Sequence, residues 1–166
     1  MAVLRTEYSI PSKTGLADIF ARCWAPSDKE PTAIFQIAHG MAEHSERYAD
    51  FAEYLCSKGF VVIADDHIGH GKSVKSDNDL GYFGESGGWD AFVEDERAVT
   101  ELMKKEYPAT PVIFFGHSMG SFIARDYIAK YGDELDGVTL CATSGEFPGL
   151  DNSIEYLKKL DQADGI

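Results

Sequence analysis

Short, almost continuously apolar segments alternate with helical patterns along this chain, and this alternation is the strongest constraint on its fold. The segments are AIFQIA at 33–38, FVVIA at 60–64 and VIFF at 112–115. Such runs are typical of strands that are buried on both faces of a parallel sheet. Strands that alternate with helices form right-handed βαβ units. The sequence therefore predicts an α/β fold with a mainly parallel sheet flanked by helices.

The remaining elements follow from periodicity and from turn residues. Apolar residues at helical spacing predict three helices, from Tyr48 to about Gly59, from Trp89 to just before Pro108, and over 118–131. We expect further strands over 8–10, 17–24 and 137–142, the first two as an antiparallel pair. No internal repeat and no second folded domain is expected.

Composition narrows the classes of function. The chain has 28 acidic and 15 basic residues and a formal net charge of −13, and a field of that sign repels phosphate backbones. We therefore expect no nucleic-acid partner. The longest apolar runs have the length of strands, and the N-terminus lacks the apolar core of a signal peptide, so we expect no transmembrane segment and a cytoplasmic location.

The cysteines and histidines give no sign of a metal site in the sequence. Cys23, Cys56 and Cys141 lie far apart in apolar segments, which favours reduced thiols in the core. A metal site needs Cys or His residues clustered at ligand spacing, and we see none. We expect neither a metal nor a cofactor.

The motif Gly116-His117-Ser118-Met119-Gly120 lies between a buried strand and an amphipathic helix. The G-x-S-x-G pattern alone would occur by chance in about one such chain in twenty. Its position is more specific, because a nucleophile elbow requires this strand-to-helix turn. The helix N-terminus after Ser118 also places partial positive charge where an oxyanion would form. Ser118 is the candidate nucleophile, and the alternative is a tight turn with an idle serine.

A second motif, AHGMAEHSERY at 38–48, follows an earlier strand. Gly40 lets the backbone bend, so the amide of Met41 is expected to converge with that of Met119 on one oxyanion-binding point. We interpret His39 as a buried, hydrogen-bonded histidine that fixes this loop, and His44 as a residue that orients the loop or lines a pocket. Glu43 and Glu46 are read as charges at a helix start, which could be merely solvated.

A third motif, DDHIGHGKS at 65–73, follows the second buried strand. Asp65 and Asp66 point to opposite faces if the strand continues through them. We expect one of the two carboxylates to cap amides of the following loop. The glycines and Lys72 lack the full spacing of a phosphate-binding loop, so a nucleotide site is not expected.

Together, HGMAEHSERY, DHIGHGKS and GHSMG resemble the α/β-hydrolase superfamily, and within it the monoacylglycerol lipase and lysophospholipase branch. The resemblance runs from about Val3 to Thr143, with Ser121 standing where this branch often has a glycine. It implies a Ser–His–Asp hydrolase of small lipid esters that acts through an acyl-enzyme on Ser118. It also implies oxyanion donors and residues that support the substrate or the loop: the amides of Met41 and Met119, and His39, Gly40 and His117.

The chain departs from this branch in one important respect. In the superfamily the acid and the histidine follow the nucleophile, whereas all five histidines here precede Ser118. His117 is a poor base, because neighbouring residues on an elbow point in different directions. Residues 1–144 are therefore expected to be the N-terminal part of a hydrolase domain, and 145–166 the start of a cap segment or a flexible tail. The sheet would then be incomplete at its C-terminal side.

Two consequences follow from this interpretation. We expect the chain to be inactive on its own and to self-associate through the exposed edge of its sheet. Two other functions remain open: a non-catalytic module that binds an acyl ligand or a partner, and a serine hydrolase of the aminopeptidase type.

Overall fold

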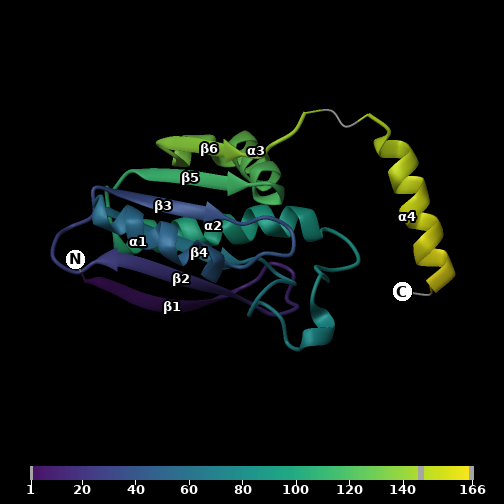
Figure 1. The fold of residues 1–166 in the computed structure, drawn as a ribbon, viewed down its shortest axis with the longest axis horizontal. Coiled ribbons are helices and arrows are strands. Elements are labelled where there is room, and N and C mark those ends of the chain that lie inside the picture. Colours follow the sequence, from purple (N-terminus) through teal and green to yellow (C-terminus); the bar gives the residue numbers. More distant parts are fainter. Residues whose placement is uncertain (1, 146–147, 165–166) are drawn as a thin grey trace.

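A computed structural model describes residues 2–145 and 148–164, and its centre is a six-stranded sheet with helices on both faces (Figure 1). The strand order is β1-β2-β4-β3-β5-β6. The strands are β1 (Val3–Pro11), β2 (Asp18–Pro26), β3 (Ala33–Ala38), β4 (Phe60–Asp66), β5 (Val112–His117) and β6 (Gly137–Cys141). β2 runs antiparallel to β1 and β4, and the remaining pairs are parallel. The predicted mainly parallel α/β sheet is confirmed.

Three helices cover the sheet. Helix α1 (Ala49–Ser57) packs on one face, while α2 (Gly88–Glu106) and α3 (Met119–Tyr131) pack on the other. All three were predicted, although Tyr48 belongs to a short 3-10 helix, η1 (Ser45–Tyr48), that precedes α1. Two further 3-10 turns are η2 (Asp77–Asp79) and η3 (Gly132–Glu134).

Strand β4 is buried along almost its whole length because both of its faces are covered. Val61 and Ile63 pack with residues of α2, whereas Val62 and Ala64 pack with residues of α1. This alternation continues to the end of the strand. It places the carboxylate of Asp65 on the α2 face and that of Asp66 on the α1 face, as predicted.

The register of β3 and β5 positions the candidate site. The two strands are parallel neighbours, and Ala38 at the end of β3 pairs with Gly116 near the end of β5. Parallel strands end at the same edge of a sheet, so the turn after β3 and the elbow after β5 emerge side by side. Two segments that lie some 80 residues apart in the sequence meet here.

Strand β6 forms one edge of the sheet in the part of the chain that the structure describes. Val138 and Leu140 on this strand are 37% and 38% exposed. Cys141 is also exposed, so the expectation that all three cysteines lie in the core is wrong for this residue. The prediction failed because β6 is an edge strand in the described part of the chain, and no further element on its outer side covers Cys141.

Helix α4 (Leu150–Asp164) follows the sheet and lies within the segment expected to be the start of a cap or a flexible tail. Leu150, Ile154, Leu157 and Leu160 recur at helical spacing and are exposed, and Figure 1 shows the helix away from the sheet. The proposed boundary at 144/145 stays a prediction. Among the described helices, none combines the length and the apolar character needed to cross a membrane.

Candidate active site

Ser118 lies on a strained turn between β5 and α3. Its φ of 51° and ψ of −114° fall in a region that residues with a side chain rarely adopt. Hydrogen bonds hold the turn in place: Ser118 N–H donates to Cys141 O at 3.0 Å, and Ser121 donates to Ser118 O from both its N–H and its hydroxyl. The backbone geometry expected of a nucleophile elbow is therefore present, and Ser118 is partly exposed.

The glycines on either side of Ser118 are required sterically. A Cβ on Gly116 would collide with the backbone of Gly120 and Ser121, at the start of α3. A Cβ on Gly120 would collide with the carbonyl of Ala38 in β3. Neither contact involves a flexible side chain that could move aside. The G-x-S-x-G pattern thus has a physical cause here, which is the close approach of α3 to β3 and β5.

The turn after β3 lies directly against the elbow. A Cβ built on Gly40 would stand 3.2 Å from the Cβ of Ser118 and 3.2 Å from Nδ1 of His117. The next residue, Met41, carries the amide expected to be an oxyanion donor, and its side chain is 72% exposed. The side chain of the other expected donor, Met119, is buried in the core beside α2 and α3.

His39 fixes the orientation of the Gly40–Met41 peptide. Nε2 of His39 accepts a hydrogen bond from His67 N–H at 3.0 Å, so the ring proton is on Nδ1, which donates to Gly40 O at 2.7 Å. Because the peptide is planar and trans, Met41 N–H points away from this buried ring. Burial, helped by the neighbouring His67 ring, lowers the pKa of His39 to about 3. His39 is therefore neutral and has no free nitrogen for proton transfer.

Glu43 binds the other side of Gly40, and this role was missed in the sequence. Its side chain is only 12% exposed, and Oε2 accepts hydrogen bonds from Gly40 N–H at 2.9 Å, from the Tyr48 hydroxyl at 2.8 Å and from His117 Nδ1 at 3.2 Å. Burial alone would raise the pKa of Glu43, but these hydrogen bonds outweigh it and lower the pKa to about 2. Glu43 is a structural anion that joins the turn to the elbow, so the reading of it as a solvated charge is corrected.

Asp66 lies on the α1 side of the sheet and binds backbone amides in the loops that follow β3 and β4. Its carboxylate accepts hydrogen bonds from Ser45 N–H at 2.7 Å and from Lys72 N–H at 2.8 Å. The predicted capping of loop amides is therefore confirmed for Asp66. Arg22 lies 3.6 Å away and bridges at 2.9 Å to Glu46, whose side chain stays on the surface.

Asp65 makes different contacts on the opposite face of the sheet. It meets His67 and Glu96 in a fully buried group whose possible ligand atoms all lie within 4.8 Å of one another. The expectation of no metal considered Cys and His at ligand spacing and so could not detect this group, and it stays a prediction. No local sequence pattern indicates this group, because Glu96 lies on α2 and is distant along the chain.

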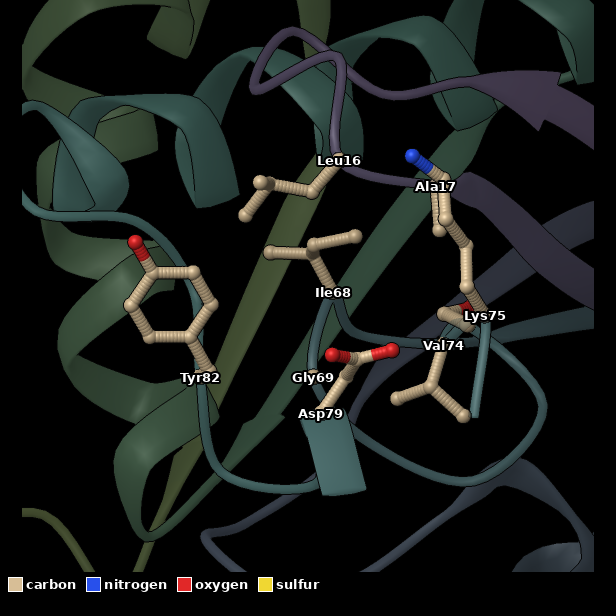
Figure 2. A pocket seen from close by; sticks show the side chains of 9 residues that line it. Leu16, Ala17, Ile68, Gly69, Val74, Lys75, Asp79 and Tyr82 are labelled. Atoms are coloured by element: carbon tan, nitrogen blue, oxygen red, sulfur yellow. The ribbon is translucent and has the colours of Figure 1, made fainter. Parts of the chain in front are cut away.

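Two cavities lie near the loops of this region. One of about 520 Å³ adjoins the turn after β3 and is lined in part by Met41, His44, His70 and Leu80. A smaller one of about 110 Å³ lies between Leu16, Ile68 and Tyr82 (Figure 2), has room for a few water molecules, and is not lined by Ser118. Ser118 does not line the larger cavity either.

The sequence is similar to those of known proteins. Residues 29–158 match the family Hydrolase_4, described as "Serine aminopeptidase, S33". A monoacylglycerol lipase of Mycolicibacterium smegmatis is 34% identical over 161 residues, which are 94% of this chain and 55% of that protein. The monoglyceride lipase of Homo sapiens is 38% identical over 122 residues, which are 74% of this chain and 38% of that protein.

Solved structures show the same architecture. A thermostable carboxyl esterase from Bacillus coagulans superposes with a TM-score of 0.85 at 38% identity and covers 98% of this chain, which corresponds to 52% of the esterase. A lipase in its open form superposes with a TM-score of 0.82 at 32% identity over 96% of this chain and 51% of the lipase. The chain thus spans about half the length of these proteins. It has the α/β-hydrolase fold and belongs to the Hydrolase_4 (serine aminopeptidase S33) family.

Proposed function

We propose that this chain is the nucleophile-bearing part of a serine hydrolase that cleaves carboxylic esters of small lipids, such as monoacylglycerols or lysophospholipids. The observation that carries the proposal is the left-handed backbone of Ser118 at the end of β5, with Gly40 packed against it. The names of the relatives, lipases and an esterase, support the class of substrate.

In the proposed reaction, Ser118 Oγ attacks the carbonyl carbon of the ester while a base removes the hydroxyl proton. The carbonyl oxygen becomes an oxyanion that accepts hydrogen bonds from the amides of Met41 and Met119. Collapse of this intermediate breaks the bond to the alcohol, which leaves with the proton, and the acyl group stays on Ser118. Water then releases the fatty acid by the same route in reverse.

Two features of the site support the oxyanion hole. The Gly40 carbonyl is bound by His39, which directs the Met41 amide away from the core. The amide of Met119 is at the first position of α3, where the helix dipole adds positive potential. Loss of one such donor typically costs about 3 kcal/mol of transition-state stabilisation.

We propose that the base of the triad, and the acid that orients it, lie outside these 166 residues. None of the five histidines follows Ser118. Both ring nitrogens of His39 are engaged, and His117 uses Nδ1 to bind Glu43. We therefore define the extended chain as a polypeptide that continues these residues to include a downstream Asp and His, and we propose that it is the active form.

Two alternatives have specific support. The family description favours peptidase action on N-terminal residues, and the missing histidine favours a non-catalytic module that binds an acyl ligand. The test is to assay the extended chain and its S118A variant against a monoacylglycerol, a lysophospholipid and aminoacyl anilides. We expect turnover of the two lipid esters that S118A abolishes. Turnover of the anilides alone would favour the peptidase, and no turnover of any substrate would favour the binding module.

A further inference from the structure

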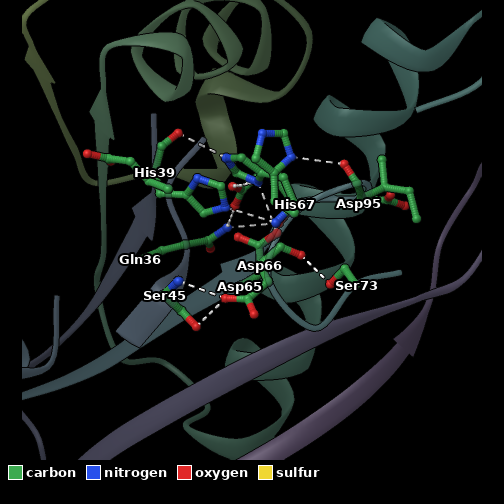
Figure 3. A network of polar contacts seen from close by, with 12 residues as sticks. Gln36, His39, Ser45, Asp65, Asp66, His67, Ser73 and Asp95 are labelled. Atoms are coloured by element: carbon green, nitrogen blue, oxygen red, sulfur yellow. Dashed lines mark hydrogen bonds and ion pairs between the residues drawn. The ribbon is translucent and has the colours of Figure 1, made fainter. Parts of the chain in front are cut away.

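A second polar centre lies on the α2 face of the sheet, apart from Ser118. Asp65 is in β4 and His67 directly follows this strand (Figure 3). Glu96 lies on α2 and comes close to both. All three residues are at most 1% exposed. Nδ1 of His67 lies 3.0 Å from Asp65 Oδ2 and 3.5 Å from Glu96 Oε1. Nothing in the proposed hydrolase chemistry uses this group.

The hydrogen bonds around His67 determine which ring nitrogen faces the carboxylates. Nε2 lies 3.1 Å from the carbonyl oxygen of His39. A carbonyl only accepts, so Nε2 carries a proton and donates it. Neutral His67 then presents the lone pair of Nδ1 to Asp65 and Glu96. Metal-binding histidines have this arrangement, with the second nitrogen held by a carbonyl or a carboxylate.

Two carboxylate oxygens in this group have no hydrogen-bond partner among the described residues, Asp65 Oδ1 and Glu96 Oε1. Buried polar atoms are rarely left in this state, because an unpaired buried acceptor loses its hydration without replacement. The other oxygen of Glu96 accepts a hydrogen bond from Gln36 Nε2 at 2.5 Å, which fixes the carboxylate in place. Its free oxygen therefore remains directed at His67.

The charges of Asp65 and Glu96 also favour a bound cation. The centre holds two buried carboxylates, and the lone pair of Nδ1 faces both of them. Asp66 has Arg22 beside it on the other face of the sheet, but no Lys or Arg of the described residues forms an ion pair with Asp65 or Glu96. If both carboxylates are ionised, they need either a bound cation or a protonated His67 beside them. One divalent cation would neutralise both charges and also bind the Nδ1 lone pair.

We propose that Asp65, His67 and Glu96 bind one divalent transition-metal ion of the Zn²⁺ or Mn²⁺ type, which ties β4 to α2. Bonds of about 2.1 Å place neighbouring ligands of a tetrahedral or octahedral ion about 3.0 to 3.4 Å apart, close to the separations measured around Nδ1. One imidazole and two carboxylates suit these ions. Because the centre is buried, the ion would enter as the chain folds, and its role would be structural.

The alternative to a metal ion is the protonation of two of these side chains, Glu96 and His67. Burial, together with the charge of Asp65, raises the pKa of Glu96 well above its usual range. Although burial lowers the pKa of His67, the charge of Asp65 outweighs it and raises that pKa. A protonated Glu96 and a protonated His67 would satisfy the same oxygens without an ion. Only a measurement of metal content separates the two occupants.

The experiment refolds the 166-residue chain with Zn²⁺ or Mn²⁺, removes unbound metal by dialysis, and measures metal per chain by mass spectrometry and the melting temperature with and without EDTA. Glu96→Gln removes one ligand and keeps the contact with Gln36. Asp95→Asn is the matched control, because Asp95 is the neighbouring buried carboxylate on α2 and binds Ser12 and Lys13 instead.

We expect about one equivalent of metal and a melting temperature that falls with EDTA, in the wild type and in D95N. In E96Q the bound metal should be at least about tenfold lower. The wild-type stoichiometry decides the matter even if E96Q does not fold. A folded wild-type chain without bound metal would overturn the proposal in favour of the protons, and equal binding by E96Q would place the metal elsewhere.

Discussion

Gly40 and Ser118 are in near contact across the gap between β3 and β5: a methyl group on Gly40 would stand 3.2 Å from the Cβ of Ser118. This distance is shorter than ordinary van der Waals contact between carbon atoms. Only a residue without a side chain fits there while leaving the elbow undisturbed. The turn that carries the Met41 amide is thereby held against the candidate nucleophile.

The first prediction concerns Gly40→Ala in the extended chain. The new methyl group would push on Ser118, His117 and Glu43, each at 3.2 Å, and would shift the turn by a few tenths of an ångström. Because an oxyanion donor acts only when it is well placed, we expect kcat for ester hydrolysis to fall at least about tenfold. Gly145→Ala is the control, since a Cβ there meets nothing within 4 Å. Equal activities of the two variants would contradict the placement of the turn.

The second prediction concerns the link between Glu43 and the turn. Glu43→Gln keeps the size of the side chain but removes the charge that three donors share. Hydrogen bonds to a charged group contribute about 1.5 to 3 kcal/mol, so we expect kcat of the extended chain to fall about 10- to 100-fold while KM changes little. Asp50→Asn is the control on the same stretch of chain, because Asp50 is exposed. A rise in KM with kcat unchanged would instead place Glu43 in substrate binding.

The third prediction concerns stability in acid. Folding lowers the pKa of Glu43 from its ordinary 4.5 to about 2. A carboxyl group whose pKa is lowered by folding stabilises the folded state above its unfolded pKa, and this contribution disappears as the pH falls through the folded pKa. We expect about 3 kcal/mol to be lost between pH 4.5 and pH 2. In E43Q this part of the denaturation curve should flatten, and an unchanged acid limb would show that folding does not lower the pKa of Glu43.

The fourth prediction concerns the edge of the sheet at β6. Val138 and Leu140 are exposed on a strand whose outer side is unpaired in the described part of the chain. Exposed apolar edges favour strand pairing between molecules. We expect the 166-residue chain to self-associate in analytical ultracentrifugation, and Leu140→Lys to shift it towards monomer. Leu4→Lys on the opposite edge strand is the matched control, and an equal effect of both changes would rule out β6 as the contact.

Local patterns in the sequence were sufficient for most of the fold. The apolar runs of β3, β4 and β5 predicted buried parallel strands because burial on both faces removes the usual alternation. The elbow at Ser118 was predictable for a similar reason, since its glycines and the strand-to-helix change lie in one short segment. The divergence of Asp65 and Asp66 followed from the two-residue period of a strand.

The features that were missed depend on contacts between distant segments. Glu43 is an ordinary glutamate in the sequence, and it becomes a buried anion only when β3 and β5 bring Gly40 and His117 to it. Glu96 meets Asp65 only because α2 packs across β4. Cys141 lies in an apolar segment, yet the position of β6 at the edge exposes it. No pattern of period two or 3.6 carries this information.

We propose that Ser118 is a nucleophile that needs a histidine from outside residues 1–166. The most direct measurement is the rate at which a fluorophosphonate labels Ser118, with the modified residue identified by peptide mass spectrometry. We predict that the extended chain labels at Ser118, that its S118A variant does not, and that the 166-residue chain labels on the order of a thousandfold more slowly or not at all, because its serine hydroxyl stays protonated without a base. Rapid labelling of Ser118 in a monomeric 166-residue chain would show that one of the five upstream histidines is the base, and would contradict this account.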